Sequence, residues 1–187
     1  AFSPYIKVDT GKSAHTSRQK NEFHFPENRE IQTRLLGELV EKEGPIHFDY
    51  AVERLVDAWG ARKVTPKISH AVQEALTALL RDQKVVIKGS FLWPPNLKEV
   101  QIRVPVEGIP ESKRKLEHIP PEEVENAMKL IAQYALGIGD DSLVSETAKV
   151  FGLNHSTDKS KEYFSEILKR LVRERKLAIK DNVITTA

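Results

Sequence analysis

The order of apolar and polar positions in residues 51–93 recurs in residues 143–185, at a constant spacing of 92 residues and without a gap. An ungapped internal repeat of this length predicts that one supersecondary unit occurs twice in the chain. A pattern that holds in both copies is therefore stronger evidence than a pattern in one. Identical residues stand at these paired positions: Gly60 and Gly152, Thr65 and Thr157, Lys67 and Lys159, Glu74 and Glu166, Leu76 and Leu168, Leu79 and Leu171, Arg81 and Arg173, and Lys84 and Lys176.

Two helices are predicted ahead of the third helix, which carries the longest apolar stripe. The first of them lies before the repeated residues. The first begins near residue 30, carries apolar residues at helical spacing, and ends at Gly44-Pro45. A short extended piece follows, and Asp49 is the expected N-cap of a second helix that runs through Trp59. We expect Trp59 to pack in the core rather than to stack on a base. The apolar residues of the first helix are Ile31, Leu35, Leu36, Leu39 and Val40.

A third helix and a β-hairpin complete the first copy. Gly60 suits the left-handed position just past the end of the second helix. Thr65 is then the expected cap of the third helix, with Pro66 at its first position, where a missing N–H costs nothing. Two β-prone runs flank a turn at residues 88–90 and predict a hairpin. The stripe of the third helix consists of Ile68, Ala71, Val72, Ala75, Leu76, Leu79 and Leu80.

The second copy predicts the same elements in the same order. A helix opens at Pro121, and Ile138 corresponds to the short extended piece of the first copy. Asp141 is the expected cap of a helix over residues 142–151, Thr157 caps the long helix, and LAIKDNVIT supplies a second hairpin. The apolar face of the opening helix holds Val124, Ala127, Met128, Ile131 and Ala132.

The order helix, short strand, helix, helix, hairpin is that of a winged helix-turn-helix. We therefore predict an α+β, mainly α fold with two tandem winged-helix units, at residues 29–95 and 119–187. Repeats of helical hairpins are the competing architecture, but they leave both β-hairpins unexplained. Residues 1–28 are predicted as a polar linker. Residues 96–118 are predicted as a second linker, with a possible edge strand at 100–104 and a solvated basic stretch, ESKRK.

Composition narrows the class of protein only moderately. At 187 residues and 40% apolar content, the chain is long enough to bury one or two cores. The absence of cysteine fits a reducing compartment, and we find neither a membrane-length apolar run nor a signal peptide, which points to the cytoplasm. The net charge of +2 indicates no particular partner. The chain begins at Ala1 and its single methionine is Met128, so we expect it to be a piece of a longer protein.

No arrangement of residues predicts catalysis. The six histidines are scattered without HExxH spacing, the serines lack a G-x-S-x-G setting, and GIGDD at 137–141 lacks the lysine of a phosphate loop. At Asp140 and Asp141, helix capping is the preferred interpretation over metal binding. We expect no enzyme activity, no cofactor, no metal and no small-molecule substrate.

DNA is the tentative partner suggested by the third helices, because that helix of a helix-turn-helix enters the major groove. Acidic Glu74, Glu162 and Glu166 lie on the same helices, and the hairpin turns carry only Lys88 and Lys180. DNA binding and protein docking therefore both remain open. The candidate DNA contacts are Arg62, Lys63, Lys67, His70 and Arg81 in the first copy and Lys159, Lys161, Lys169, Arg170 and Arg173 in the second, with Asn154 and His155 in the turn before it.

Several short motifs also resemble a known family. EGPIH at 43–47, AWG at 58–60, FLWP at 91–94 and IPPEEVENAM at 119–128 are similar to a domain of unknown function at the C-terminal end of large bacterial superfamily 1 helicase-like proteins. The resemblance covers roughly residues 30–187 and implies a setting behind helicase motor and restriction-endonuclease-like domains. It brings no catalytic residues, and motor and nuclease motifs are lacking here. Our first hypothesis is therefore a non-catalytic accessory module of such a protein that orients DNA through the third helices; the alternative is a module that docks on domains of the same parent chain.

Overall fold

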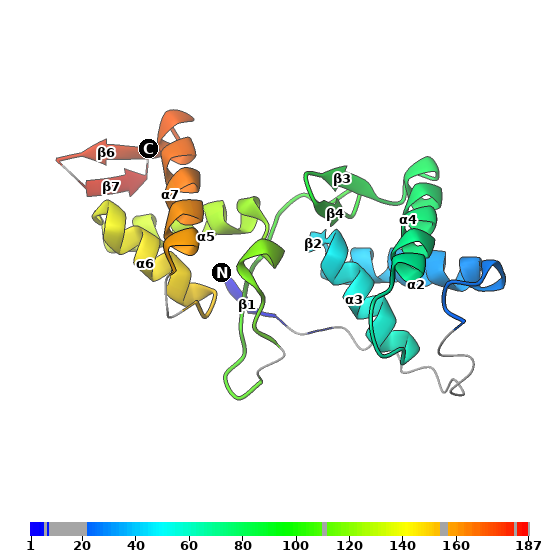
Figure 1. Cartoon of the computed structure of the whole chain (residues 1–187). Coiled ribbons are helices and arrows are strands. Elements are labelled where there is room, and N and C mark those ends of the chain that lie inside the picture. Colours follow the sequence, from blue (N-terminus) through cyan, green and yellow to red (C-terminus); the bar gives the residue numbers. More distant parts are fainter. Residues whose placement is uncertain (6, 8–21, 110–111, 154–156, 182, 187) are drawn as a thin grey trace. The chain divides into compact units, whose positions relative to one another are not determined.

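The computed structural model describes residues 1–5, 7, 22–109, 112–153, 157–181 and 183–186. The chain forms two compact units (Figure 1). The N-terminal unit spans Lys7–Lys98, and the C-terminal unit combines Ala1–Ile6 with Glu99–Ala187. Both are mainly helical with small sheets, so the fold class is α+β, mainly α, as predicted. None of the helices in the described ranges is long and apolar enough to cross a membrane.

The described residues of the N-terminal unit form three α-helices, one 3-10 helix and a three-stranded antiparallel sheet. The strand order is β2-β4-β3, with Ile46 opposite Leu92 and Ile87 also opposite Leu92 on its other side. The short strand between the first two helices therefore extends the hairpin into a sheet. The elements are the 3-10 helix η1 (Pro26–Asn28), α2 (Arg29–Glu43), β2 (Ile46–His47), α3 (Phe48–Trp59), α4 (Pro66–Arg81), β3 (Val86–Lys88) and β4 (Phe91–Trp93).

Three helices and a hairpin also form the body of the C-terminal unit. Ile138 makes an isolated antiparallel bridge to Ile184. This bridge corresponds to the pairing of β2 with β4 in the N-terminal unit. A second, parallel pair joins the start of the chain to the segment after the N-terminal unit. The elements are β1 (Phe2–Pro4), β5 (Ile102–Val104), the 3-10 helix η3 (Leu116–His118), α5 (Pro121–Ala135), α6 (Asp140–Val150), α7 (Asp158–Arg173), β6 (Leu177–Lys180) and β7 (Val183–Thr186).

The 92-residue spacing of the sequence recurs in the geometry of the two units. The bounds of α5 and α7 are those of α2 and α4 moved along by 92 positions. The pairing of Ile46 with Leu92 returns as that of Ile138 with Ile184. Thr65 accepts from the N–H of Ile68 at 3.3 Å, and Thr157 accepts from that of Ser160 at 3.2 Å. The first and third helices thus share their bounds in the two units, the third helices share a threonine cap, and the hairpins share their register.

Equivalent leucines fill the two cores. Leu76 and Leu168 are both buried, as are Leu79 and Leu171. Trp59 is buried with its ring edge-to-face against Phe23 at a centroid distance of 5.2 Å, which places it in the core as expected. The apolar stripes are narrower than the sequence indicates. Ile31 is 39% exposed, and Leu80 and Ile131 are half-buried.

Two helix starts differ from the predicted ones. The N-cap of α3 is His47, whose Nδ1 accepts from the N–H of Asp49 at 3.3 Å, rather than Asp49 itself. Helix α6 begins at Asp140 after Gly139, and no side chain caps it. Asp49, Asp140 and Asp141 therefore lie in the first helical turns. Carboxylates there are stabilised by the positive end of the helix dipole without acting as caps.

Both predicted linkers contain ordered structure. Within residues 1–28, β1 pairs with β5, and Tyr5 and Phe23 are buried, while Phe2 and Phe25 are exposed. Within residues 96–118, the expected edge strand is β5, shortened to Ile102–Val104. The basic stretch expected in solvent instead buries Arg114, because that side chain bonds a buried carboxylate.

Candidate functional site

The start of α4 carries the most open cluster of candidate cations. Arg62 and Lys63 precede the Thr65 cap, and Lys67 occupies the first turn of the helix. All three side chains are exposed, and within the described ranges none forms an ion pair. The positive end of the helix dipole adds positive potential at the same place. The structure thus brings these three predicted residues together around one helix end.

In the C-terminal half of α4, charged side chains are paired with side chains of opposite charge. Arg81 bonds Asp82 with its Nε at 2.9 Å, and this hydrogen bond lowers the pKa of the Asp82 carboxyl. Glu74, on the same helix, pairs with Arg29 of α2. His70 is exposed between the two ends. The cationic character of α4 is therefore concentrated at its start.

On α7, the predicted cations separate into free and paired side chains. Lys159 and Lys161 are exposed and form no ion pair with another described residue. Lys169 bonds Glu166 at 2.9 Å, and Arg170 bonds Glu125 of α5. Arg173 is exposed. Asn154 and His155 lie outside the described residues.

Arg170 stabilises the fold through an ion pair with Glu125. Glu125 binds two cations. Its side chain is 11% exposed and receives Arg170 together with Lys176, the latter at 3.2 Å. Lys176 also bonds Glu174 at 2.7 Å. This network ties α7 and the segment before β6 to α5. Sequence reasoning misses it because Glu125 and Arg170 are 45 residues apart.

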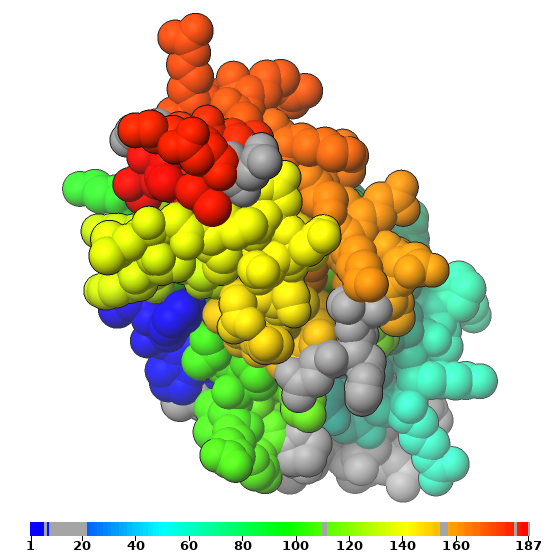
Figure 2. Space-filling view, turned by 90° about the vertical axis from the view of Figure 1, so that its left-hand side faces the viewer, coloured from blue at the N-terminus to red at the C-terminus, as the bar shows by residue number. Residues whose placement is uncertain are grey.

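A groove recurs at the same place in both units, between the start of the second helix, the third helix and the hairpin. We call it the C-terminal groove in the C-terminal unit, where its volume is about 410 Å³. The N-terminal groove has about 260 Å³. Figure 2 shows α6 (yellow), α7 (orange) and the hairpin (red) together on one face of the C-terminal unit. Six lining positions correspond at the 92-residue spacing: Phe48 and Asp140, Asp49 and Asp141, Gln73 and Ser165, Leu76 and Leu168, Ile87 and Ile179, and Leu92 and Ile184.

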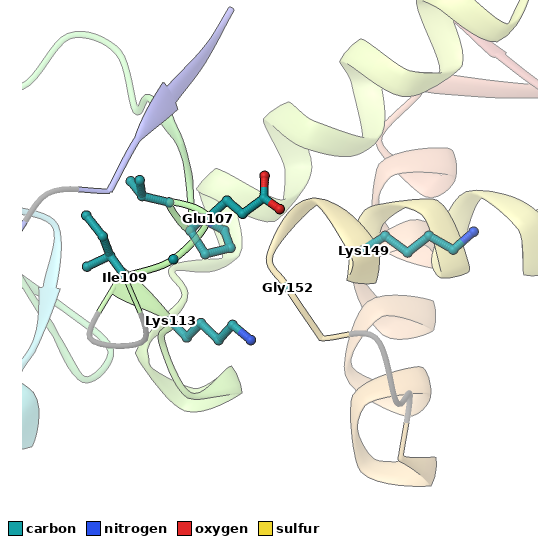
Figure 3. Close-up of a pocket in the computed structure, with 8 residues that line it drawn as sticks. Glu107, Ile109, Lys113, Lys149 and Gly152 are labelled. Atoms are coloured by element: carbon teal, nitrogen blue, oxygen red, sulfur yellow. The ribbon is translucent and has the colours of Figure 1, made fainter.

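A third pocket, of about 340 Å³, lies between the loop after β5 and the end of α6 (Figure 3). A Cβ at Gly152 would lie 2.9 Å from Cγ of Pro105, so only glycine allows this loop its close approach. Lys149 bonds Glu146 at 2.7 Å, and its side chain points away from Glu107. Its charge is therefore not directed into the pocket, and the surface there does not form a defined anion site.

The most deeply buried charged side chains form ion pairs that stabilise the fold. Glu123 is fully buried and accepts from Arg114 at 2.5 and 2.9 Å and from Arg103 at 2.8 and 3.2 Å. The Arg114 guanidinium also lies 4.6 Å from the centre of the Tyr5 ring. Burial by itself raises the pKa of Glu123, but the hydrogen bonds and charges of the two arginines outweigh it and hold that pKa below its usual value.

The N-terminal unit contains a simpler buried ion pair, between Arg54 and Glu43 at 2.6 Å. Neither buried pair was predicted, because nothing in a single sequence distinguishes an internal arginine from a solvated one. Across the part of the chain that the structure describes, no group of three or more His, Asp or Glu side chains is placed to hold a metal ion.

Comparisons with known proteins reach only part of the chain. No curated protein and no solved structure matches it. A family match falls on the N-terminal unit and includes α2, β2, α3 and the start of α4. The family model described as a protein of unknown function (DUF3320) matches residues 21–70, so this segment is similar to a domain of unknown function.

Proposed function

We propose that the chain is a tandem winged-helix module without catalysis of its own, which contacts DNA as an accessory part of a helicase- or nuclease-like protein. The element order of each unit supports the fold: helix, short strand or bridge, two helices, and a hairpin. The shared helix bounds and strand register support a duplication. The helicase setting rests on the resemblance of the short motifs around residues 43–47, 58–60 and 91–94.

The observation that carries DNA contact is the cluster of Arg62, Lys63 and Lys67 at the start of α4. These side chains are exposed and free of ion pairs in the described structure, and they surround a helix start. Cations at the positive end of a helix dipole form a favourable environment for phosphate. Because contacts to phosphate carry no sequence information, we expect binding through these three cations to depend little on sequence.

The test measures DNA affinity by fluorescence anisotropy on single-stranded and duplex oligonucleotides of unrelated sequence. Each phosphate contact releases counterions, so replacing Arg62 and Lys63 with alanine should flatten the salt slope by roughly two units and weaken binding equally on all sequences. Replacing Lys159 and Lys161 should flatten it by roughly one to two units if α7 also contacts phosphate. The control is Arg81→Ala, which removes a cation already paired with Asp82. Absence of binding at about 50 µM protein, far above common non-specific dissociation constants at low salt, would reject DNA contact.

A second candidate function is docking on protein domains of the same parent chain. It is favoured in the C-terminal unit, where Lys169 and Arg170 are engaged in ion pairs and the adjacent groove is apolar with charges of both signs around it. An apolar surface ringed by mixed charge is typical of a protein-binding site rather than a DNA-binding one.

A further inference from the structure

The C-terminal groove differs from the N-terminal groove in size and charge. Asp140 replaces the aromatic Phe48, and Ser165 replaces the longer Gln73. The C-terminal groove, with smaller side chains at these two positions, also has the larger volume. Its floor consists of Leu168 and Ile184, both buried. The equivalent elements thus enclose a larger groove in the C-terminal unit than in the N-terminal unit.

Ile179 forms an apolar wall of the opened groove and is 53% exposed. Its neighbours on the floor are buried, so an apolar side chain placed against Ile179 would continue the core outward. Burying that exposed apolar surface is favourable because it removes the surface from water. The groove is therefore suited to apolar side chains of a ligand.

Charges of opposite sign lie on opposing elements of the groove. Asp140 and Asp141 stand exposed at the start of α6, and neither forms an ion pair within the described residues. Lys169 and Arg173 stand on α7, and Lys169 is partly neutralised by Glu166. The N-terminal groove has Phe48 where the C-terminal one has Asp140, and its lining, among the described residues, includes Asp49 but no lysine or arginine. Arg81, at the position of Arg173, is instead bonded to Asp82. Of the two grooves, the C-terminal one is therefore the one lined by charges of both signs.

We infer that the C-terminal groove docks an amphipathic segment of a protein partner, with apolar side chains flanked by a basic residue on one side and an acidic residue on the other. The basic residue faces Asp140 and Asp141, and the acidic residue faces Arg173. Nucleic acid fits poorly, because the two aspartates repel phosphate and the apolar floor offers it no partner. The inference rests on the second candidate function and names the partner that this function requires.

The test begins with a phage-displayed library of random peptides, panned against the full chain and counter-selected on the full-chain variant Ile179→Asp. Enriched peptides should combine an apolar centre with basic residues on one side and acidic residues on the other. A synthetic copy of the most enriched peptide is then titrated by fluorescence anisotropy. Failure to enrich any peptide over the Ile179→Asp variant, or enrichment of peptides without the two-signed pattern, would overturn the inference.

Matched variants locate the binding surface. Ile179→Asp should weaken the peptide about tenfold or more, whereas Ile87→Asp, at the equivalent exposed position of the N-terminal unit, should leave affinity within about twofold. Replacing Asp140 and Asp141 with lysine should weaken the peptide by a similar factor and favour a version whose basic residues are changed to glutamate. Equal losses in both isoleucine variants would contradict docking in this groove. DNA affinity, measured in parallel, should respond to Arg62→Ala and not to Ile179→Asp, so the failure of one function is distinguishable from the failure of the other.

Discussion

At the scale of single residues, the burial of charge separates structural ion pairs from surface cations. Arg114 and Arg103 are held by a buried carboxylate, and Arg54 is held by Glu43. Breaking such a pair leaves an uncompensated buried charge, which is why buried pairs resist substitution more strongly than surface pairs. The cations at the start of α4 have no such partner in the described structure. They are therefore available to an external ligand, as are Lys159 and Lys161 on α7.

Glu123→Gln should destabilise the C-terminal unit by about 3–5 kcal/mol, because it leaves two arginines without their carboxylate. Urea unfolding followed by circular dichroism measures the loss. Tryptophan fluorescence serves as an internal reference, since Trp59 and Trp93 both lie in the N-terminal unit and should report little change. The control variant is Glu146→Gln, which breaks an exposed pair and should cost at most about 1 kcal/mol.

The lowered pKa of Glu123 predicts how the stability of the C-terminal unit depends on pH. The pKa of Glu123 is lower in the folded state than in the unfolded chain, so its contribution is complete above the unfolded value of about 4.5. That contribution is lost as the pH falls from about 4.5 through the lower folded pKa. Glu123→Gln should therefore be least harmful, relative to the wild type, at the acid end. A constant difference in stability between pH 7 and pH 3 would contradict this assignment.

At the scale of elements, sequence reasoning succeeds where the chemistry is local. The Thr65 and Thr157 caps, the left-handed Gly60 and the two hairpins each depend on residues within one turn of each other. It fails where a competing local partner exists, as when the imidazole of His47 takes the capping role expected of Asp49. The exposure of the candidate cations could be predicted from helical periodicity. The pairing of Arg170 could not, because its partner lies on another helix.

The equivalent leucines of α4 and α7 test the internal symmetry of the fold. Leu76→Ala and Leu168→Ala should each cost about 2–5 kcal/mol, because each leaves a cavity in a packed core. Only Leu76→Ala should shift the unfolding curve followed by tryptophan fluorescence, since both tryptophans share its unit. Ile87→Ala, at an exposed position of the hairpin, is the control and should change stability little. A negligible cost for either leucine variant would show that the two positions are not equivalent.

At the scale of the whole molecule, the order of the chain and the order of the units differ. The first residues belong to the C-terminal unit, although the N-terminal unit follows them directly in sequence. Strand β1 pairs in parallel with β5, and the N–H of Tyr5 donates to the carbonyl of Val104 at 2.7 Å. Nothing in a polar N-terminal sequence identifies a strand whose partner begins about a hundred residues later. The internal repeat does not predict this pairing either, because β1 and β5 lie outside the repeated residues.

Tyr5→Ala should therefore destabilise the C-terminal unit and spare the N-terminal unit. The substitution removes a buried ring that lies 4.6 Å from the Arg114 guanidinium and 5.5 Å from that of Arg103, at an expected cost of about 3 kcal/mol. Hydrogen–deuterium exchange measured by mass spectrometry should show faster exchange in peptides from residues 99–153 and unchanged exchange in residues 29–93. Phe2→Ala, on the exposed side of the same strand, is the control and should leave both regions protected. Faster exchange confined to residues 29–93 would mean that the start of the chain stabilises the N-terminal unit, contrary to the pairing of β1 with β5.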